Sequence, residues 1–111
     1  MNEDKLNQIY SCPIEYTLDQ VSGKWKLVIL WHLSNTNIMR YGEIKKSLNG
    51  ITHKMLSQQL KELESDGFIN RVAYPVVPPK VEYSLTEKGN SFLPILKMMS
   101  EWGNRNLEES K

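Results

Sequence analysis

The spacing of apolar residues changes at Gly67, and this change limits the fold more than any other feature of the 111-residue sequence. Residues 52–66 carry apolar side chains at helical spacing. Residues 68–74 and 81–85 are instead rich in the β-branched and aromatic side chains typical of strands. Gly67 itself can adopt the left-handed conformation that ends a helix. The sequence therefore predicts a helix followed directly by a β-hairpin.

The hairpin is expected to have a stiff tip, because the segment between its strands, residues 75–80, contains three prolines. Proline has no backbone N–H for a sheet ladder, so these residues form a loop with Lys80 at the tip. A helical pattern over 41–48 precedes the helix at 52–66, and an Asn-Gly pair separates the two. A helix-turn-helix followed by a hairpin predicts a winged helix-turn-helix.

The other elements make the chain a single, mainly α domain with a small β-hairpin (α+β), covering residues 1–111. They are expected to be a short helix (13–21), an apolar helix (24–34), a turn (35–37), a short strand (38–39) and a long last helix (87–107). The helix at 24–34 has almost no polar face, which predicts a place in the middle of the core. Pro94 should either kink the last helix or begin its main segment.

The net charge of +1 hides an uneven distribution. Residues 24–61 hold seven Lys and Arg against one acid, Glu43, which gives +6 for this segment and −5 for the rest of the chain. A basic segment is often no more than a solvated helix face. Here the basic segment coincides with the helix-turn-helix, which favours a surface for nucleic acid.

The second helix of the motif separates its side chains into two faces. In a helical projection, the side chains on the inner face are Leu56, Leu60 and Leu63, and those on the outer face are Lys54, Ser57, Gln58 and Lys61. Gln can bond adenine edges in the major groove, and Lys can reach guanine or phosphate. An ordinary solvated face would mix Glu with Lys, but Glu62 and Glu64 lie off the centre of this one. The outer face is therefore predicted to read DNA.

Further DNA contacts are predicted around this helix. Thr52 and His53 begin it, where backbone N–H groups can bind a phosphate, although His53 also fits an ordinary surface residue. Phosphate or groove contacts are predicted for basic residues near the first helix and on the hairpin, namely Arg40, Lys45, Lys46, Arg71 and Lys80. For Lys80 the alternative is a solubilising charge on a loop.

Cys12, the only cysteine, is the one candidate for covalent chemistry. It lies at a helix start, where the helix dipole favours a thiolate. The alternative is a small buried apolar side chain. The positions of Cys12, His32 and His53 do not have the spacing of metal ligands, and His32 is expected to be a core imidazole. The sequence predicts no metal, no cofactor and no enzyme, since no catalytic motif is present and a nucleophilic Cys12 would lack a nearby base.

The sequence predicts a cytoplasmic protein that forms a homodimer. A lone cysteine fits a reducing compartment, and the longest nearly apolar run, residues 25–31, is far short of the ~20 residues of a membrane span. The N-terminus also lacks the layout of a signal peptide. The last helix carries more apolar surface than so small a body can cover, so it is expected to pair two subunits with the help of Ile9, Tyr10 and Tyr16.

Several motifs together resemble a known family. They lie at residues 12–18 (CPIEYTL), 23–26 (GKWK), 30–33 (LWHL), 51–63 (ITHKMLSQQLKEL), 74–86 (YPVVPPKVEYSLT) and Gly89. In this combination the chain resembles the HxlR family over residues 10–104. This family comprises bacterial and archaeal winged helix-turn-helix transcription regulators related to the MarR group.

The resemblance implies a homodimer joined through its N- and C-terminal helices that binds palindromic operator DNA through residues 52–66 and 68–85. It also implies a role for Cys12, because in several relatives the equivalent cysteine senses electrophiles or oxidants, whereas in others it has no known sensing role. With no second cysteine, only a Cys12–Cys12 bridge between subunits or a small-thiol adduct would be available. The alternative function is a winged-helix module that binds protein and not DNA. No small-molecule effector is indicated.

Overall fold

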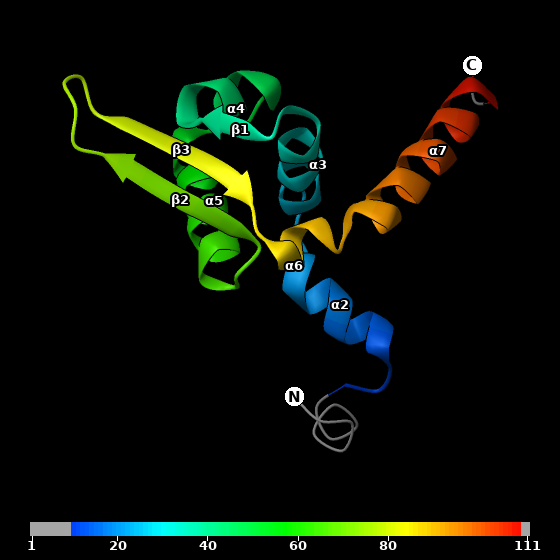
Figure 1. Cartoon of the computed structure of the whole chain (residues 1–111). Helices are drawn as coiled ribbons and strands as arrows, with labels where there is room; N and C mark the ends of the chain where they lie inside the picture. The colour runs from blue at the N-terminus through cyan, green and yellow to red at the C-terminus, as the bar shows by residue number, and fades with distance from the viewer. Residues whose placement is uncertain (1–9, 110–111) are drawn as a thin grey trace.

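The computed structural model describes residues 10–109 of the chain, so the predicted contribution of Ile9 lies outside the described residues. Its elements follow in the order α2 (Pro13–Val21), α3 (Lys26–Thr36), β1 (Ile38–Arg40), α4 (Tyr41–Ser47), α5 (His53–Ser65), β2 (Ile69–Tyr74), β3 (Lys80–Leu85), α6 (Glu87–Asn90) and α7 (Leu93–Glu109). Helices α4 and α5 form the helix-turn-helix, and β2 and β3 form the wing (Figure 1). The predicted winged helix-turn-helix is confirmed.

The three strands form one antiparallel sheet with the order β1-β3-β2. Tyr83 of the central strand β3 lies in register with Met39 of β1 and with Arg71 of β2. Residues in register point to the same face, so these three side chains share one face of the sheet. Met39, Tyr83 and Ile69 are buried, which makes this the inner face. Since Arg71 lies on the same face but beyond the core, its exposed side chain points towards α5 and not away from it.

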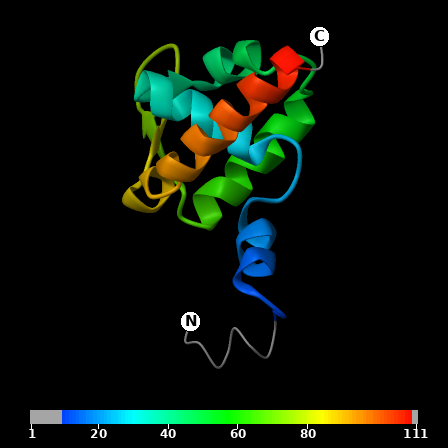
Figure 2. The same cartoon turned by 90° about the vertical axis from the view of Figure 1, so that its right-hand side faces the viewer.

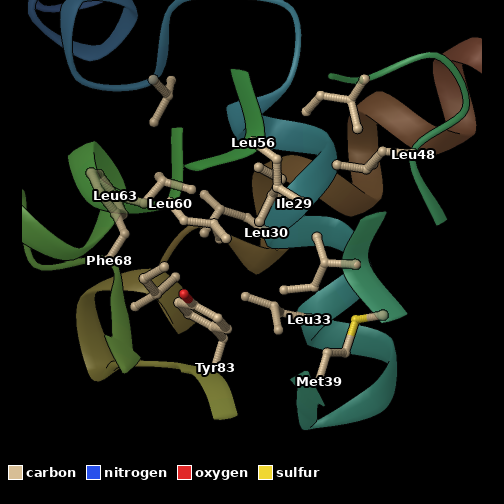
Figure 3. Packing of buried hydrophobic residues seen from close by; sticks show 14 of the residues in the cluster. Ile29, Leu30, Leu33, Met39, Leu48, Leu56, Leu60, Leu63, Phe68 and Tyr83 are labelled. Atoms are coloured by element: carbon tan, nitrogen blue, oxygen red, sulfur yellow. The ribbon is translucent and has the colours of Figure 1, made fainter. Parts of the chain in front are cut away.

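The core fills the space between α3, α4, α5 and the inner face of the sheet (Figure 3). Its fully buried side chains come from three helices and are Ile29, Leu30, Leu33, Ile44, Leu56 and Leu63. The leucines of α5 are buried as their helical spacing predicts. Burial of a Leu side chain is worth about 1.5–3 kcal/mol, so this apolar face fixes α5 to the body of the domain.

Helix α3 is less central than predicted. Ile29, Leu30 and Leu33 face the core, but Val28 is 38% exposed and Trp31 is only partly buried. The helix also runs two residues further than expected and ends at Thr36, followed by the C-terminal cap Asn37 with a φ of 70°. The prediction of a helix buried all round is wrong because α7 covers only part of the outer side of α3. His32 is likewise half-buried and not a core residue.

The ends of α5 are closed by local hydrogen bonds. At the start, Thr52 Oγ1 accepts a hydrogen bond from Met55 N at 3.1 Å, which satisfies one of the unpaired N–H groups of the first turn. At the other end, Gly67 has a φ of +83°, and Phe68 N donates to Leu63 O at 2.9 Å. This is the predicted left-handed C-terminal cap.

The segment after the wing returns to the end of α5 and binds three successive carbonyl groups there. Thr86 Oγ1 donates to Gly67 O at 2.6 Å, Thr86 N donates to Phe68 O at 3.1 Å, and Lys88 Nζ donates to Asp66 O at 2.7 Å. We call these five residues the closing corner. It joins the end of α5, the base of the wing and the start of α6.

The structure divides the last helix predicted for residues 87–107 into α6 and α7. Ser91 and Phe92 separate the two, and Pro94 is the second residue of α7. Proline fits the first turn of a helix because it has no N–H to leave unpaired there. Pro94 therefore lies at the start of the main segment of the last helix, which was one of the two alternatives predicted from the sequence. From this break α7 leaves the body of the domain (Figure 1) and crosses α3 (Figure 2).

No helix within residues 10–109 is long and apolar enough to cross a membrane.

Candidate nucleic-acid interface

The outer face of α5 carries the side chains that the projection placed there. Lys54, Ser57, Gln58 and Lys61 are all exposed. Within residues 10–109, Lys54, Gln58 and Lys61 make no hydrogen bond or ion pair with another side chain. Two cations and an amide are thus free to bind an external partner.

A groove of about 540 Å³ lies between α5 and the wing. Its lining includes Lys54, Ser57, Gln58 and Lys61 from α5 and Arg71 from β2. Five of the predicted contacts are therefore brought together on one surface, which we call the α5 groove. The register of the sheet explains why Arg71 takes part, because its pairing with Tyr83 directs it to the inner face.

Tyr41 is a member of this groove that the sequence interpretation treated only as an apolar helix position. Its hydroxyl lies 3.1 Å from His53 Nδ1, 3.2 Å from His53 O and 3.3 Å from Ser57 Oγ. The rings of Tyr41 and His53 are stacked, with centroids 5.8 Å apart. One tyrosine of α4 thus orients two of the predicted contacts in the N-terminal part of α5. The separation of 12 residues between Tyr41 and His53 gives no local pattern that would predict it.

Glu64 also lines the α5 groove, although its position on the projection was off the centre of the reading face. It is exposed and, within residues 10–109, forms no ion pair with Lys61 or Arg71. A carboxylate there repels phosphate and can accept a hydrogen bond from cytosine N4. The groove is therefore mixed in charge towards the C-terminal end of α5 and positive towards its start.

Arg40 and Lys80 lie on the opposite face of the sheet from Arg71. Arg40 pairs in register with Glu82, and Lys80 Nζ lies 3.5 Å from Glu82 Oε2. Lys80 Nζ is also 4.8 Å from the centre of the Tyr74 ring, a cation–π contact. The prediction that Lys80 is at the wing tip is wrong, because it is the first residue of β3. A hydrogen bond to the Glu82 carboxylate raises the pKa of Tyr74.

The remaining basic residues of the predicted surface separate into two groups. Lys46 is exposed and Lys45 half-buried in the last turn of α4, so both lie outside the α5 groove. Lys26 is only 7% exposed, and its Nζ lies 3.4 Å from Glu62 Oε2. The charge of Lys26 is thus compensated inside the domain. The basic surface is smaller than the +6 of its segment indicates.

Cys12 is exposed at the N-terminal cap of α2, so its interpretation as a buried apolar side chain is wrong for the single chain. Its Sγ lies 3.9 Å from Glu15 Oε1. In the described part of the chain, no group of three or more His, Cys, Asp or Glu side chains is arranged to hold a metal ion.

A second surface, between α3 and α7, has the opposite character. It is a shallow apolar hollow of about 250 Å³ lined by Leu27, Val28, Trp31, Leu96, Met99 and Ser100. Beside it, Trp102 of α7 is 61% exposed. Apolar surface of this kind marks an interface with protein or lipid more often than one with nucleic acid.

The winged helix and its exposed, cationic second helix define a DNA-binding transcription regulator. The chain belongs to the HxlR-like helix-turn-helix family, which matches residues 20–111. It is 61% identical over 97 residues to MalR of Fusobacterium mortiferum, named as a regulatory protein, covering 87% of this chain and 92% of MalR. The redox regulator HypR in its reduced form is 46% identical with a TM-score of 0.81, covering 90% of this chain and 100% of HypR. HypR in its oxidised form is 47% identical with a TM-score of 0.80, covering 85% and 96%.

Proposed function

We propose that the protein acts in the cytoplasm as a homodimer that binds palindromic operator DNA, with α5 in the major groove. The observation that carries this proposal is the unpaired polar and cationic face of α5, continued by Arg71 across the α5 groove. Gln58 has the side chain to read a base edge, while Lys54, Lys61 and Arg71 have the charge to bind phosphate or guanine. Thr52 and His53, at the start of the helix, lie where backbone N–H groups can meet a phosphate.

The contacts outside the groove have supporting roles in this proposal. Lys45 and Lys46 of α4, the helix that crosses the DNA backbone in this geometry, bind phosphates. Lys80 is paired with Glu82 on the outer face of the sheet, and Arg40 lies opposite Glu82 in the strand register, so we expect each to contribute less than Lys54 or Lys61.

The homodimer is supported by the apolar surface of α7. Trp102 is 61% and Met99 50% exposed, and a second copy offers the same apolar face for them to pack against. A two-fold dimer would present two α5 helices about 34 Å apart, which matches one turn of B-DNA.

The test is the salt dependence of DNA binding, measured by fluorescence anisotropy on the chromosomal region upstream of the gene. Lys54→Ala and Lys61→Ala should each weaken binding and make the dependence on salt concentration shallower by about one unit per lost phosphate contact. Lys97→Ala, an exposed lysine on α7, is the matched control and should change neither quantity. Gln58→Ala should relax the sequence preference at one base pair.

The competing interpretation is a winged helix that binds protein and not DNA. Unchanged DNA affinity in both the Lys54→Ala and the Lys61→Ala variant would remove α5 as the reading element. A wild-type chain that binds the upstream DNA no better than random duplex at the same salt would favour the competing interpretation.

We propose redox regulation through Cys12 as a second function, because the thiol is exposed and the similar protein HypR is a redox regulator with an oxidised form. Two Cys12 thiols, one from each subunit, would lose two electrons and two protons to an oxidant such as diamide and form a disulfide. Diamide should then produce a covalent dimer on a non-reducing gel, which Cys12→Ser abolishes and a reducing agent reverses. Absence of this species, together with unchanged DNA affinity after diamide treatment, would contradict the proposal.

A further inference from the structure

Tyr41 and His53 are the first residues of α4 and α5, and the two helix starts hold them against each other. The carboxylate of Glu43 closes the start of α4, and the hydroxyl of Thr52 closes the start of α5. The rings of Tyr41 and His53 stack with an angle of 8° between their planes. Their contact therefore has a defined geometry, from which the positions of the protons can be worked out.

The Tyr41 hydroxyl has one proton to donate and lies near three polar atoms. His53 O can only accept, so a hydrogen bond across its 3.2 Å from the hydroxyl uses the phenol proton. His53 Nδ1, at 3.1 Å, can then bond to the hydroxyl only by donating an Nδ1–H. Ser57 Oγ, at 3.3 Å, can donate to the remaining lone pair of the phenol oxygen. This network contains three hydrogen bonds.

The other tautomer of His53 makes one hydrogen bond fewer. With the proton on Nε2, Nδ1 would accept the phenol proton, and His53 O would lose its bond from the hydroxyl. The tautomer of a histidine is set by the hydrogen bond that one of its nitrogens makes. The geometry thus favours a neutral ring with its proton on Nδ1 and a lone pair on Nε2. Within residues 10–109, no hydrogen bond or ion pair occupies Nε2.

The free nitrogen of His53 belongs to the part of α5 that approaches bases in the proposed complex. His53 is exposed, and the N-terminal residues of a recognition helix contact base edges. In the major groove, the hydrogen-bond donors are the amino groups of adenine and cytosine. A lone pair on Nε2 matches these amino groups, whereas an N–H would match guanine, thymine or a phosphate oxygen.

We infer that Tyr41 is a positioning residue that holds His53 with its proton on Nδ1, so that neutral His53 selects the amino group of adenine or cytosine. This inference rests on the proposed binding of DNA by α5 and names the class of base that one of its contacts reads. Protonation of His53 adds a proton to Nε2 and makes it a donor, while Nδ1–H keeps its bond to Tyr41. The selection imposed by Tyr41 therefore applies to the neutral ring alone.

The charged groups around the pair determine how this can be tested. Lys54 follows His53 on α5, and Lys54, Glu64 and Arg71 line the α5 groove together with Tyr41. Within the described residues, none of them forms an ion pair with His53. A histidine side chain is ordinarily neutral at about pH 8 and charged at about pH 5.5. Comparing these two conditions in matched variants separates the effect of the tautomer from that of the neighbouring charges.

The direct test is the tautomer of His53 in the free protein at about pH 8, measured from the nitrogen chemical shifts of its ring by NMR. The wild type should carry the proton on Nδ1. Tyr41→Phe keeps the stacked ring and removes the hydroxyl, so it should shift His53 towards the Nε2–H form. Ser47→Ala removes another α4 hydroxyl that donates to a backbone carbonyl, and should leave the tautomer unchanged. A wild-type ring with its proton on Nε2 would overturn the inference.

The second test is base preference, measured with a duplex that the wild-type protein selects from a random-sequence library at about pH 8. Tyr41→Phe should lower the affinity for this duplex about three- to tenfold and lose the preference for adenine or cytosine at one position. At about pH 5.5, where both ring nitrogens carry a proton, Tyr41→Phe and the wild type should bind alike. In a His53→Ala background, Tyr41→Phe should have no further effect, because Tyr41 acts through His53.

Two binding results would overturn the inference. An equal loss of affinity in Tyr41→Phe at both pH values would show that the hydroxyl only supports the packing of α4 on α5. No loss at either pH would show that it has no part in reading DNA. If Lys54→Ala still weakens binding in the same assay, the proposed function stands without the inference; if Lys54→Ala is also without effect, the proposed function fails as well.

Discussion

Helices α5 and α7 are both amphipathic, but among residues 10–109 only α5 has its apolar face covered. Leu56, Leu60 and Leu63 of α5 are buried, and the face that remains exposed is polar and cationic. Helix α7 buries only Leu96 and leaves Trp102 and other apolar side chains in solvent. The difference indicates two kinds of partner, since a polar face fits an anionic polymer and an apolar face fits another apolar surface.

The largest expected effect tests whether the apolar residues of the two helices contribute differently to folding. Leu63→Ala should lower the free energy of unfolding by about 2–5 kcal/mol, because it leaves a cavity in the core. Met98→Ala, at a side chain that is 70% exposed in the single chain, should change the free energy of unfolding of the monomer by no more than about 0.5 kcal/mol. Urea unfolding at a protein concentration low enough to keep the chain monomeric measures both values. Equal losses would mean that α7 is as much a part of the core as α5.

A smaller effect is expected on the association of subunits. Trp102→Asp should weaken self-association at least about tenfold, because it places a charge in the apolar face of α7. Asn104→Asp adds the same charge at an exposed position of the same helix and serves as the control. Sedimentation velocity over a concentration series gives the dimer dissociation constant. If the two variants behave alike, the apolar face of α7 does not hold the dimer.

The smallest effect concerns Gln59, the polar side chain on the buried side of α5. Its Oε1 is buried and has no hydrogen-bond partner among residues 10–109, while its Nε2 lies 3.3 Å from Glu62 Oε2. Gln59→Met should raise the free energy of unfolding by about 1 kcal/mol, since it removes an unpaired polar atom from the interior. Gln58→Met, on the exposed side, should leave stability within about 0.5 kcal/mol of the wild type. A loss of stability in Gln59→Met would show that its amide is needed where it lies.

The features that could be predicted from the sequence are those with a local pattern. The helical spacing of Leu56, Leu60 and Leu63 gave the inner face of α5, and the change at Gly67 gave the start of the wing. The exposed positions of Lys54 and Gln58 follow from the same geometry. Each depends on residues within a few turns of one another, so no knowledge of the folded chain was required.

The errors concern contacts between residues far apart in the chain. Lys26 counted as part of the basic segment 24–61, but folding places it beside Glu62, which lies just outside that segment, so the sum of charges does not show that the two compensate each other. The hydroxyl of Tyr41 reaches His53 and Ser57 only because α4 packs against α5. The sequence left open whether Pro94 kinks the last helix or begins its main segment, because the apolar spacing continues across the break between α6 and α7.

The closing corner has a consequence for how DNA sequence is chosen. Thr86 and Lys88 bind the carbonyl groups of Asp66, Gly67 and Phe68. Helix α5 and the wing are therefore fixed to each other at one end. If both elements bind the duplex as proposed, the distance between them is set by the protein, and the duplex must adjust to it. A duplex whose grooves already have that spacing costs less energy to bind than one that must be bent or untwisted. Base pairs that no side chain touches would then contribute to the preferred sequence through their stiffness.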